Sequence, residues 1–150
     1  MRKQKLLVIC LVFLLVLLLA GCGNKDKADE EGGYTAEEID VDLTTLSKTM
    51  VYSEVFNMMT ETDNYIDKVV KMEGEFAVYQ DEDTGEYHYG CIIEDATACC
   101  SQGLEFILDG EYTYPEDFPE EGEKICVVGV FDVEEDGYFI YCFLKDAKMI

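Results

Sequence analysis

Apolar and polar residues alternate with a period of two along most of the second half of the chain. This alternation is typical of β-strands that bury one face. Five segments show it, separated by short turns and by one long loop that holds both prolines: residues 69–80, 86–94, 104–110, 124–137 and 138–150. Gly74 and Gly129 interrupt two of these segments, and glycines within strands suit the sharp bends of a small barrel.

A helical pattern precedes the strands. Within residues 50–59, apolar side chains recur at the spacing of one helix face, at Val51, Val55, Met58 and Met59. Ser47 or Thr49 can cap this helix. We interpret the methionines as core-filling residues rather than metal ligands, because methionine packs irregular core gaps. One short helix followed by five strands predicts a mainly β fold, a small five-stranded OB-like barrel. A flat open sheet with one helix is the alternative.

The chain opens on a different pattern. Arg2, Lys3 and Lys5 precede an unbroken apolar run over residues 6–20, and small residues follow it. A basic start, a short apolar core and small residues before a break are the features of a secretory signal peptide. The run is shorter than the roughly 20 apolar residues that a membrane-spanning helix needs. A cleaved signal peptide therefore fits better than the alternative, an uncleaved signal anchor.

The stretch LLLAGC, residues 17–22, resembles the lipobox of bacterial lipoproteins. The resemblance implies removal of residues 1–21 and acylation of Cys22, and buried acyl chains contribute about 0.8 kcal/mol per methylene to membrane binding. Residues 22–35 then form the lipidated cysteine and a flexible linker, since their charges and glycines cannot bury a core. The remaining residues, 36–150, suit one domain. We expect this domain to be held by lipid at the extracytoplasmic face of the cell membrane.

The formal net charge of the chain is −22 at pH 7. Nucleic-acid binding relies on basic patches that release counterions from phosphates, so nucleic acid is not an expected partner. We interpret the acidity as a solvated exterior that also keeps the domain off anionic lipid. A surface that attracts cations or a basic partner is the alternative. No acidic loop with calcium-binding spacing is present, which argues against a standard calcium site.

Sequence signals for catalysis are poor. The chain has one histidine and no Cys-x-x-Cys motif, phosphate-binding loop or Gly-x-Ser-x-Gly motif, so redox, nucleotide and serine-hydrolase chemistry lack their usual residues. A nucleophile pair of Cys99 or Cys100 with His88 lacks a third group to orient it. The sequence therefore predicts a binding module rather than an enzyme.

After removal of residues 1–21 and acylation of Cys22, five cysteines remain: Cys91, Cys99, Cys100, Cys126 and Cys142. An odd number of cysteines cannot pair completely within the chain. We interpret Cys126 and Cys142 as core residues, because they lie inside apolar strands. The adjacent pair Cys99 and Cys100, with Cys91 on the preceding strand, leaves three hypotheses open.

The first hypothesis is a metal site in which Cys91, Cys99 and Cys100 converge as thiolates, which select zinc, copper(I) or iron–sulfur centres. His88 is the least favoured ligand of this set, because it points to the strand face opposite Cys91. The second is a disulfide from Cys91 to Cys99 or Cys100, since adjacent cysteines rarely bond each other. The third is that these cysteines are small buried hydrophobes.

Tyrosines supply a second candidate surface. Four of them cluster in or near the predicted strands: Tyr87, Tyr89, Tyr138 and Tyr141. OB folds bind oligomers on one face of the barrel by stacking them on aromatic rings. We therefore expect these tyrosines to bind a sugar or a protein partner. The alternative is that they pack with their hydroxyl groups at the rim.

Several stretches within residues 64–133 resemble two related groups of proteins: NYIDKVVKMEGEF, HYGCIIEDATACC, GLEF and DFPEEGEKICVVGVF. One group comprises lipoproteins with an OB-like domain of the tRNA-anticodon-binding type. The other is the extracytoplasmic domain of a permease-subunit family linked to metal homeostasis, especially of zinc. Cys99 and Cys100 match the paired cysteines of that family. Asp95 and Ala96 precede the pair here, whereas the family's acid follows it, so the acid is not carried over as a ligand.

The resemblance implies an extracytoplasmic accessory of a metal transporter or permease. Together with the residue patterns, it predicts a surface-anchored lipoprotein that acts as a non-catalytic binding module and holds zinc on thiolates. The alternative is a structural or partner-binding envelope module with a disulfide or buried cysteines and no metal.

Replacing Cys22 with alanine is expected to release the protein from membranes, because the acyl chains can no longer be attached. Immunoblots of membrane and soluble fractions measure this change. The matched control is Cys10→Ala, which alters a cysteine within the apolar run and should leave the protein in the membrane fraction. Persistent membrane association of the Cys22→Ala protein would count against lipid anchoring.

Overall fold

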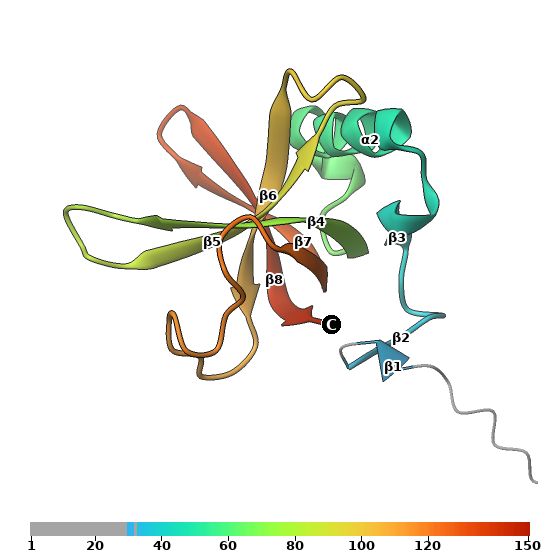
Figure 1. The fold of residues 1–150 in the computed structure, drawn as a ribbon. Coiled ribbons are helices and arrows are strands. Elements are labelled where there is room, and N and C mark those ends of the chain that lie inside the picture. The colour runs from blue at the N-terminus through green and yellow to red at the C-terminus, as the bar shows by residue number, and fades with distance from the viewer. Residues whose placement is uncertain (1–29, 32) are drawn as a thin grey trace, which may run out of the picture.

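The computed structural model describes residues 30–31 and 33–150 (Figure 1). The expected signal peptide, Cys22 and most of the expected linker lie outside these residues. The elements in chain order are β1 (Glu30–Glu31), β2 (Tyr34–Thr35), β3 (Val41–Asp42), η1 (Leu43–Thr45), α2 (Lys48–Thr60), η2 (Thr62–Asn64), β4 (Val69–Gln80), β5 (Tyr87–Glu94), β6 (Ser101–Leu108), β7 (Lys124–Asp136) and β8 (Phe139–Met149). Within the described part, no helix has the length and apolar character needed to cross a membrane.

The five long strands, β4 to β8, pair in a closed ring. β4 pairs with β5, β5 with β6, β6 with β8, β8 with β7, and β7 returns to β4. Within the ring only the β6–β8 pair is parallel. The closure excludes the flat open sheet. It confirms the prediction of a mainly β fold in which one short helix precedes five strands.

One strand starts earlier than the apolar alternation predicts. β6 begins at Ser101, rather than at residue 104, because Ser101 and Gln102 pair with Glu94 and Ile93 of β5. Backbone ladder bonds do not require apolar side chains, so the strand continues past the point where the alternation stops. The turn between β5 and β6 is correspondingly short.

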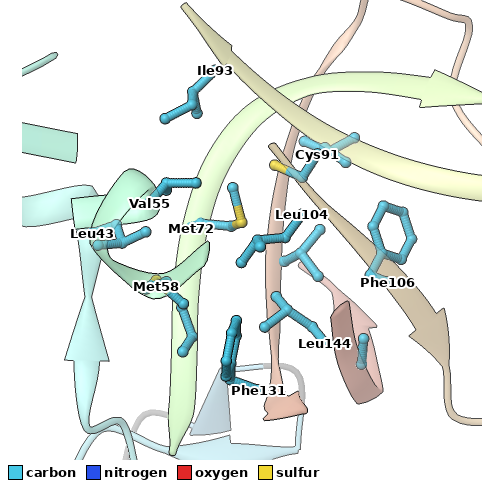
Figure 2. Close-up of a cluster of buried hydrophobic side chains, with 14 of the residues drawn as sticks. Leu43, Val55, Met58, Met72, Cys91, Ile93, Leu104, Phe106, Phe131 and Leu144 are labelled. Atoms are coloured by element: carbon cyan, nitrogen blue, oxygen red, sulfur yellow. The ribbon is translucent and has the colours of Figure 1, made fainter. Parts of the chain in front are cut away.

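Apolar side chains from every strand of the ring fill its interior, as Figure 2 shows for Met72, Cys91, Leu104, Phe106, Phe131 and Leu144. Val55 and Met58 of α2, with Leu43 of η1, pack against this cluster and are fully buried. Met59, expected on the same helix face, is 43% exposed. Successive helix positions are turned by about 100°, so only one of the two neighbouring methionines faces the ring.

The loop between β6 and β7, residues 109–123, covers the ring on the side away from α2 (Figure 1). Its Phe118 stacks on Tyr89 with ring centroids 4.1 Å apart and on Phe76 at 5.7 Å. Tyr114 of the same loop packs on Tyr87 at 4.8 Å. Such ring pairs add about 0.5–1.5 kcal/mol each beyond the area they bury. This loop therefore continues the core instead of lying free over the surface.

Two glycines on adjacent strands give a test of how closely the ring is packed. A Cβ atom at Gly103 would lie 2.3 Å from the Cys91 carbonyl oxygen, whereas one at Gly90 would have its nearest neighbour, Ile92 Cδ1, at 3.5 Å. Gly103→Ala is therefore expected to lower the free energy of unfolding by about 1–3 kcal/mol. Gly90→Ala should change it by less than about 0.5 kcal/mol. Chemical denaturation of both variants measures the difference, and equal stabilities would contradict it.

Candidate functional site

The turn between β5 and β6 brings three chemically active side chains together. Potential metal-ligand atoms of Asp95, Cys99 and Cys100 all lie within 4.8 Å of one another. Among the described residues, this is the cluster of cysteine and acidic side chains that could hold a metal ion. The Asp95 N–H donates to the Cys100 carbonyl oxygen at 2.9 Å and closes the turn. Ala98 takes a left-handed conformation with φ of 54°. The turn thereby returns the cysteines to the aspartate.

The Asp95 carboxylate organises this turn. Its Oδ1 accepts hydrogen bonds from the backbone N–H groups of Thr97, at 3.1 Å, and Cys99, at 3.0 Å. Its Oδ2 lies 3.3 Å from the Cys99 Sγ. The backbone bond from Cys99 is the main cause that lowers the pKa of Asp95 below its ordinary value. The group is therefore an ionised carboxylate at neutral pH, with one oxygen holding the turn and the other facing a thiol.

The two thiols lie side by side at the surface. Cys99 Sγ and Cys100 Sγ are 3.6 Å apart, and both residues are exposed. The hydrogen bond with Cys99 is the main cause that raises the pKa of Cys100, and the nearby charges of Cys99 and Asp95 raise it further. Two thiolates and a carboxylate so close together repel one another. A bound cation would offset this repulsion and favour the deprotonated form of all three groups.

The two separations measured from the Cys99 sulfur approach those around a tetrahedral zinc ion. Zinc–sulfur bonds of about 2.3 Å and zinc–oxygen bonds of about 2.1 Å require edges of about 3.8 Å between two sulfurs and about 3.6 Å between sulfur and oxygen. The corresponding separations here are 3.6 Å between the thiols and 3.3 Å from Cys99 to Asp95. Movements of a few tenths of an ångström would adjust these two edges, and the third edge, from Asp95 to Cys100, lies within 4.8 Å. Three protein ligands would leave one coordination position open.

The structure does not bring Cys91 or His88 into this group. Cys91 is fully buried inside the ring, and burial raises the pKa of its thiol to about 12, so it stays protonated. His88 lies on the opposite face of β5, as the strand alternation predicts, with Nδ1 2.7 Å from Glu105 Oε1. Of the four residues expected to bind metal, only Cys99 and Cys100 meet.

Asp95 is the site residue that the sequence reasoning set aside, because it precedes the cysteine pair. The sequence does carry a signal for it. An aspartate followed two residues later by a backbone N–H that it can bind forms an Asx turn, and Asp95 makes this bond to Thr97. The signal concerns local turn geometry rather than a ligand motif. It shows how an acid on one side of a cysteine pair can fold back onto it.

None of the five cysteines in the described residues forms a disulfide. The disulfide from Cys91 to Cys99 or Cys100, which was the second of the three hypotheses, is therefore not formed in this structure. Cys126 and Cys142, expected in the core, are half-buried, and burial raises the pKa of the Cys142 thiol. The pair Cys99 and Cys100 is thus the most exposed part of the thiol set.

The four tyrosines expected to bind a partner do not form one surface. Tyr87 and Tyr89 lie on the inner-facing side of β5 and pack under the 109–123 loop. Tyr138 lies at the tip of the β7–β8 hairpin and is fully exposed. Tyr141 lies on β8 and lines a hollow next to β6. Tyr87 is still 41% exposed and Tyr89 also lines the hollow, so the four tyrosines lie in separate surroundings rather than on one stacking face.

No family model, curated protein or solved structure with which the chain was compared matches it. The resemblance to the metal-linked permease subunits therefore stays a prediction. A functional proposal has to rest on the geometry of the turn at residues 95–100.

Proposed function

We propose that this chain is a lipid-anchored extracytoplasmic binding module that holds a zinc ion on Cys99, Cys100 and Asp95 and exchanges it with a transporter or permease in the same membrane. The observation that carries the proposal is the convergence of two thiol sulfurs and one carboxylate oxygen within 4.8 Å. The role is binding and transfer of the ion, without catalysis.

The ligand set favours zinc among the common divalent ions. Thiolates select soft or borderline metals, whereas magnesium and calcium require sites built from oxygen. The carboxylate of Asp95 is a normal third ligand for zinc. Hydrogen bonds to its Oδ1 from the turn backbone fix the orientation of the group, as outer contacts do in many metal sites. The turn is therefore arranged for an ion before the ion arrives.

Exposure and coordination number favour exchange over permanent retention. Structural zinc sites are closed by four protein ligands, whereas this turn offers three and both cysteines are exposed. A ligand from a partner protein can occupy the open position and take over the ion. β1 and β2 pair with each other within the expected linker over residues 22–35. The part that precedes β1, residues 22–29, would reach at most about 29 Å when extended, which allows the domain to meet a neighbouring membrane protein.

The charge of the chain supports the same role. A net charge of −22 raises the local concentration of cations around the domain and speeds their association. The same charge keeps the domain away from anionic lipid head groups. An acidic domain on a flexible tether would therefore collect cations while staying free to contact a partner.

The full chain, purified in a non-ionic detergent without oxygen, is expected to bind about one zinc ion per chain, as elemental analysis measures. The double variant Cys99→Ser, Cys100→Ser should lose this metal, because serine hydroxyls are poor zinc ligands. The matched control Cys126→Ser, Cys142→Ser should retain it. Metal retained at full stoichiometry by the first variant would place the site elsewhere. A metal-free wild type with reduced thiols would favour the envelope module without metal.

Asp95→Asn separates the two roles of the aspartate. Asparagine keeps an oxygen that can accept the backbone N–H groups of Thr97 and Cys99, so the turn is expected to persist. Loss of the negative ligand should raise the Kd for zinc at least about tenfold, or about 1.4 kcal/mol. Competition with a chromogenic chelator measures this constant. An unchanged Kd would show that Asp95 only shapes the turn.

A further inference from the structure

A hollow of about 630 Å³ lies on the outer face of β4, β5 and β6. Ala77, Gly90 and Gly103, on three neighbouring strands, line its floor with small residues, and the side chain of Ile92 lies beside the two glycines. Tyr79 of β4 and Tyr141 of β8 line it from strands on opposite sides of β5 and β6. Its volume lies in the range of pockets that hold molecules larger than a single ion.

Packing between the strands explains why one of the two floor glycines is a glycine, but not the other. Gly103 has to be glycine, since a Cβ there would overlap the backbone of β5. Gly90 does not, because a Cβ at this position would meet Ile92 Cδ1 at 3.5 Å and Ala77 Cβ at 3.9 Å, which are ordinary contacts. A side chain at position 90 would fit the strand and fill the hollow. The open space is therefore a property of this sequence rather than a demand of the ring.

The walls of the hollow are aromatic and accessible. Tyr79 is 62% exposed and Tyr141 is 52% exposed. Phe139, with its ring centroid 6.5 Å from that of Tyr141, continues the aromatic surface towards the hairpin tip. A ligand that covers these exposed rings removes apolar surface from water, which favours binding. The ring faces also attract ammonium and guanidinium groups.

The charges around the hollow have one sign. Asp81 and Glu105 line it, and neither lysine nor arginine does. Glu134 stands opposite Tyr141 in the β7–β8 pair, so its side chain lies on the same face of the hairpin. His88 is the remaining titratable group of the lining besides the tyrosines, and its Nδ1 is bonded to Glu105 Oε1. An anionic ligand would meet repulsion here, and a cationic one attraction.

We propose that this hollow binds an extended segment of a partner protein that carries arginine or lysine, with the cationic side chain between Tyr79 and Tyr141 and its charge on Glu105. Acidic groups and aromatic faces recognise the same cation by two independent attractions. The hollow lies apart from the turn of Asp95, Cys99 and Cys100, so the proposal does not depend on metal binding.

The test uses the full chain in a non-ionic detergent and fluorescein-labelled octa-arginine as the probe, with binding followed by fluorescence anisotropy at about 150 mM salt to screen diffuse attraction. Gly90→Val fills the hollow without changing the charge. It is expected to raise the Kd for octa-arginine at least tenfold, as is the double variant Tyr79→Ala, Tyr141→Ala. Tyr138→Ala is the matched control, because it removes a fully exposed tyrosine outside the hollow. Its Kd should match that of the wild type.

Circular dichroism checks that each variant is folded. If Gly90→Val does not fold, the double variant of the two exposed tyrosines still tests the proposal. Equal octa-arginine binding by the wild type and both hollow variants would show diffuse attraction to an acidic protein and would overturn the proposal. A chito-oligosaccharide that binds the wild type but neither hollow variant, while octa-arginine binding is unaffected, would also overturn it, by showing that the occupant is a sugar.

Acidification is expected to weaken octa-arginine binding. The hydrogen bond to Glu105 is the main cause that raises the pKa of His88, and the nearby charges of Asp81 and Glu86 raise it further. Below that pKa the imidazole is cationic, offsets the Glu105 charge and repels an incoming guanidinium. The Kd measured near about pH 5.5 should therefore exceed that near about pH 8.5, and His88→Gln should remove the difference. Tighter binding at the lower pH would contradict recognition by Glu105.

Discussion

Closure of the ring at β4 is the constraint on which the rest of the structure depends. The first half of β4 pairs with β7, from Val69 to Glu75, and the second half pairs with β5, from Glu75 to Gln80. β4 uses one edge for each neighbour, over different halves of its length, so the change of partner falls near Glu75, which pairs with both. Gly74 lies next to this point, and a Cβ there would lie 2.5 Å from the Ile92 carbonyl oxygen. A side chain at this position would push β5 away from β4.

Closure fixes what each face of β5 can do. Once β5 is held between β4 and β6, Cys91 and its alternate neighbours point into the core, and His88, Gly90 and Glu94 point outward. The core-facing cysteine loses access to water and to any exchangeable ion. The outward side provides the floor of the hollow. Binding that needs contact with solvent can therefore occur on the outer face and at the turn after Glu94. This turn carries the exposed thiols.

Much of the fold could be predicted from the sequence, because alternation with a period of two reports directly which strand face is buried. It placed the strands, and it placed His88 and Cys91 on opposite faces. It could not assemble the site. Whether Cys99 meets Cys91 or Asp95 depends on the left-handed conformation of Ala98 and on two backbone bonds to one carboxylate oxygen. Such a turn has no periodicity, and its geometry depends on single dihedral angles.

The turn that carries Asp95, Cys99 and Cys100 leads directly into β6, which lines the hollow with Gly103 and Glu105, and this arrangement has a consequence for how the two sites could work together. Cys100 and Gly103 are three residues apart, which corresponds to about 10 Å along a strand. A peptide lying in the hollow would therefore hold the rest of its protein close to the thiols. The start of β6 is also fixed, because the Gln102 side chain donates to the Tyr52 carbonyl oxygen of α2. A partner docked in the hollow would therefore hold its own ligand at a fixed distance, beside the open coordination position. Transfer of the ion would then need no separate collision in solution.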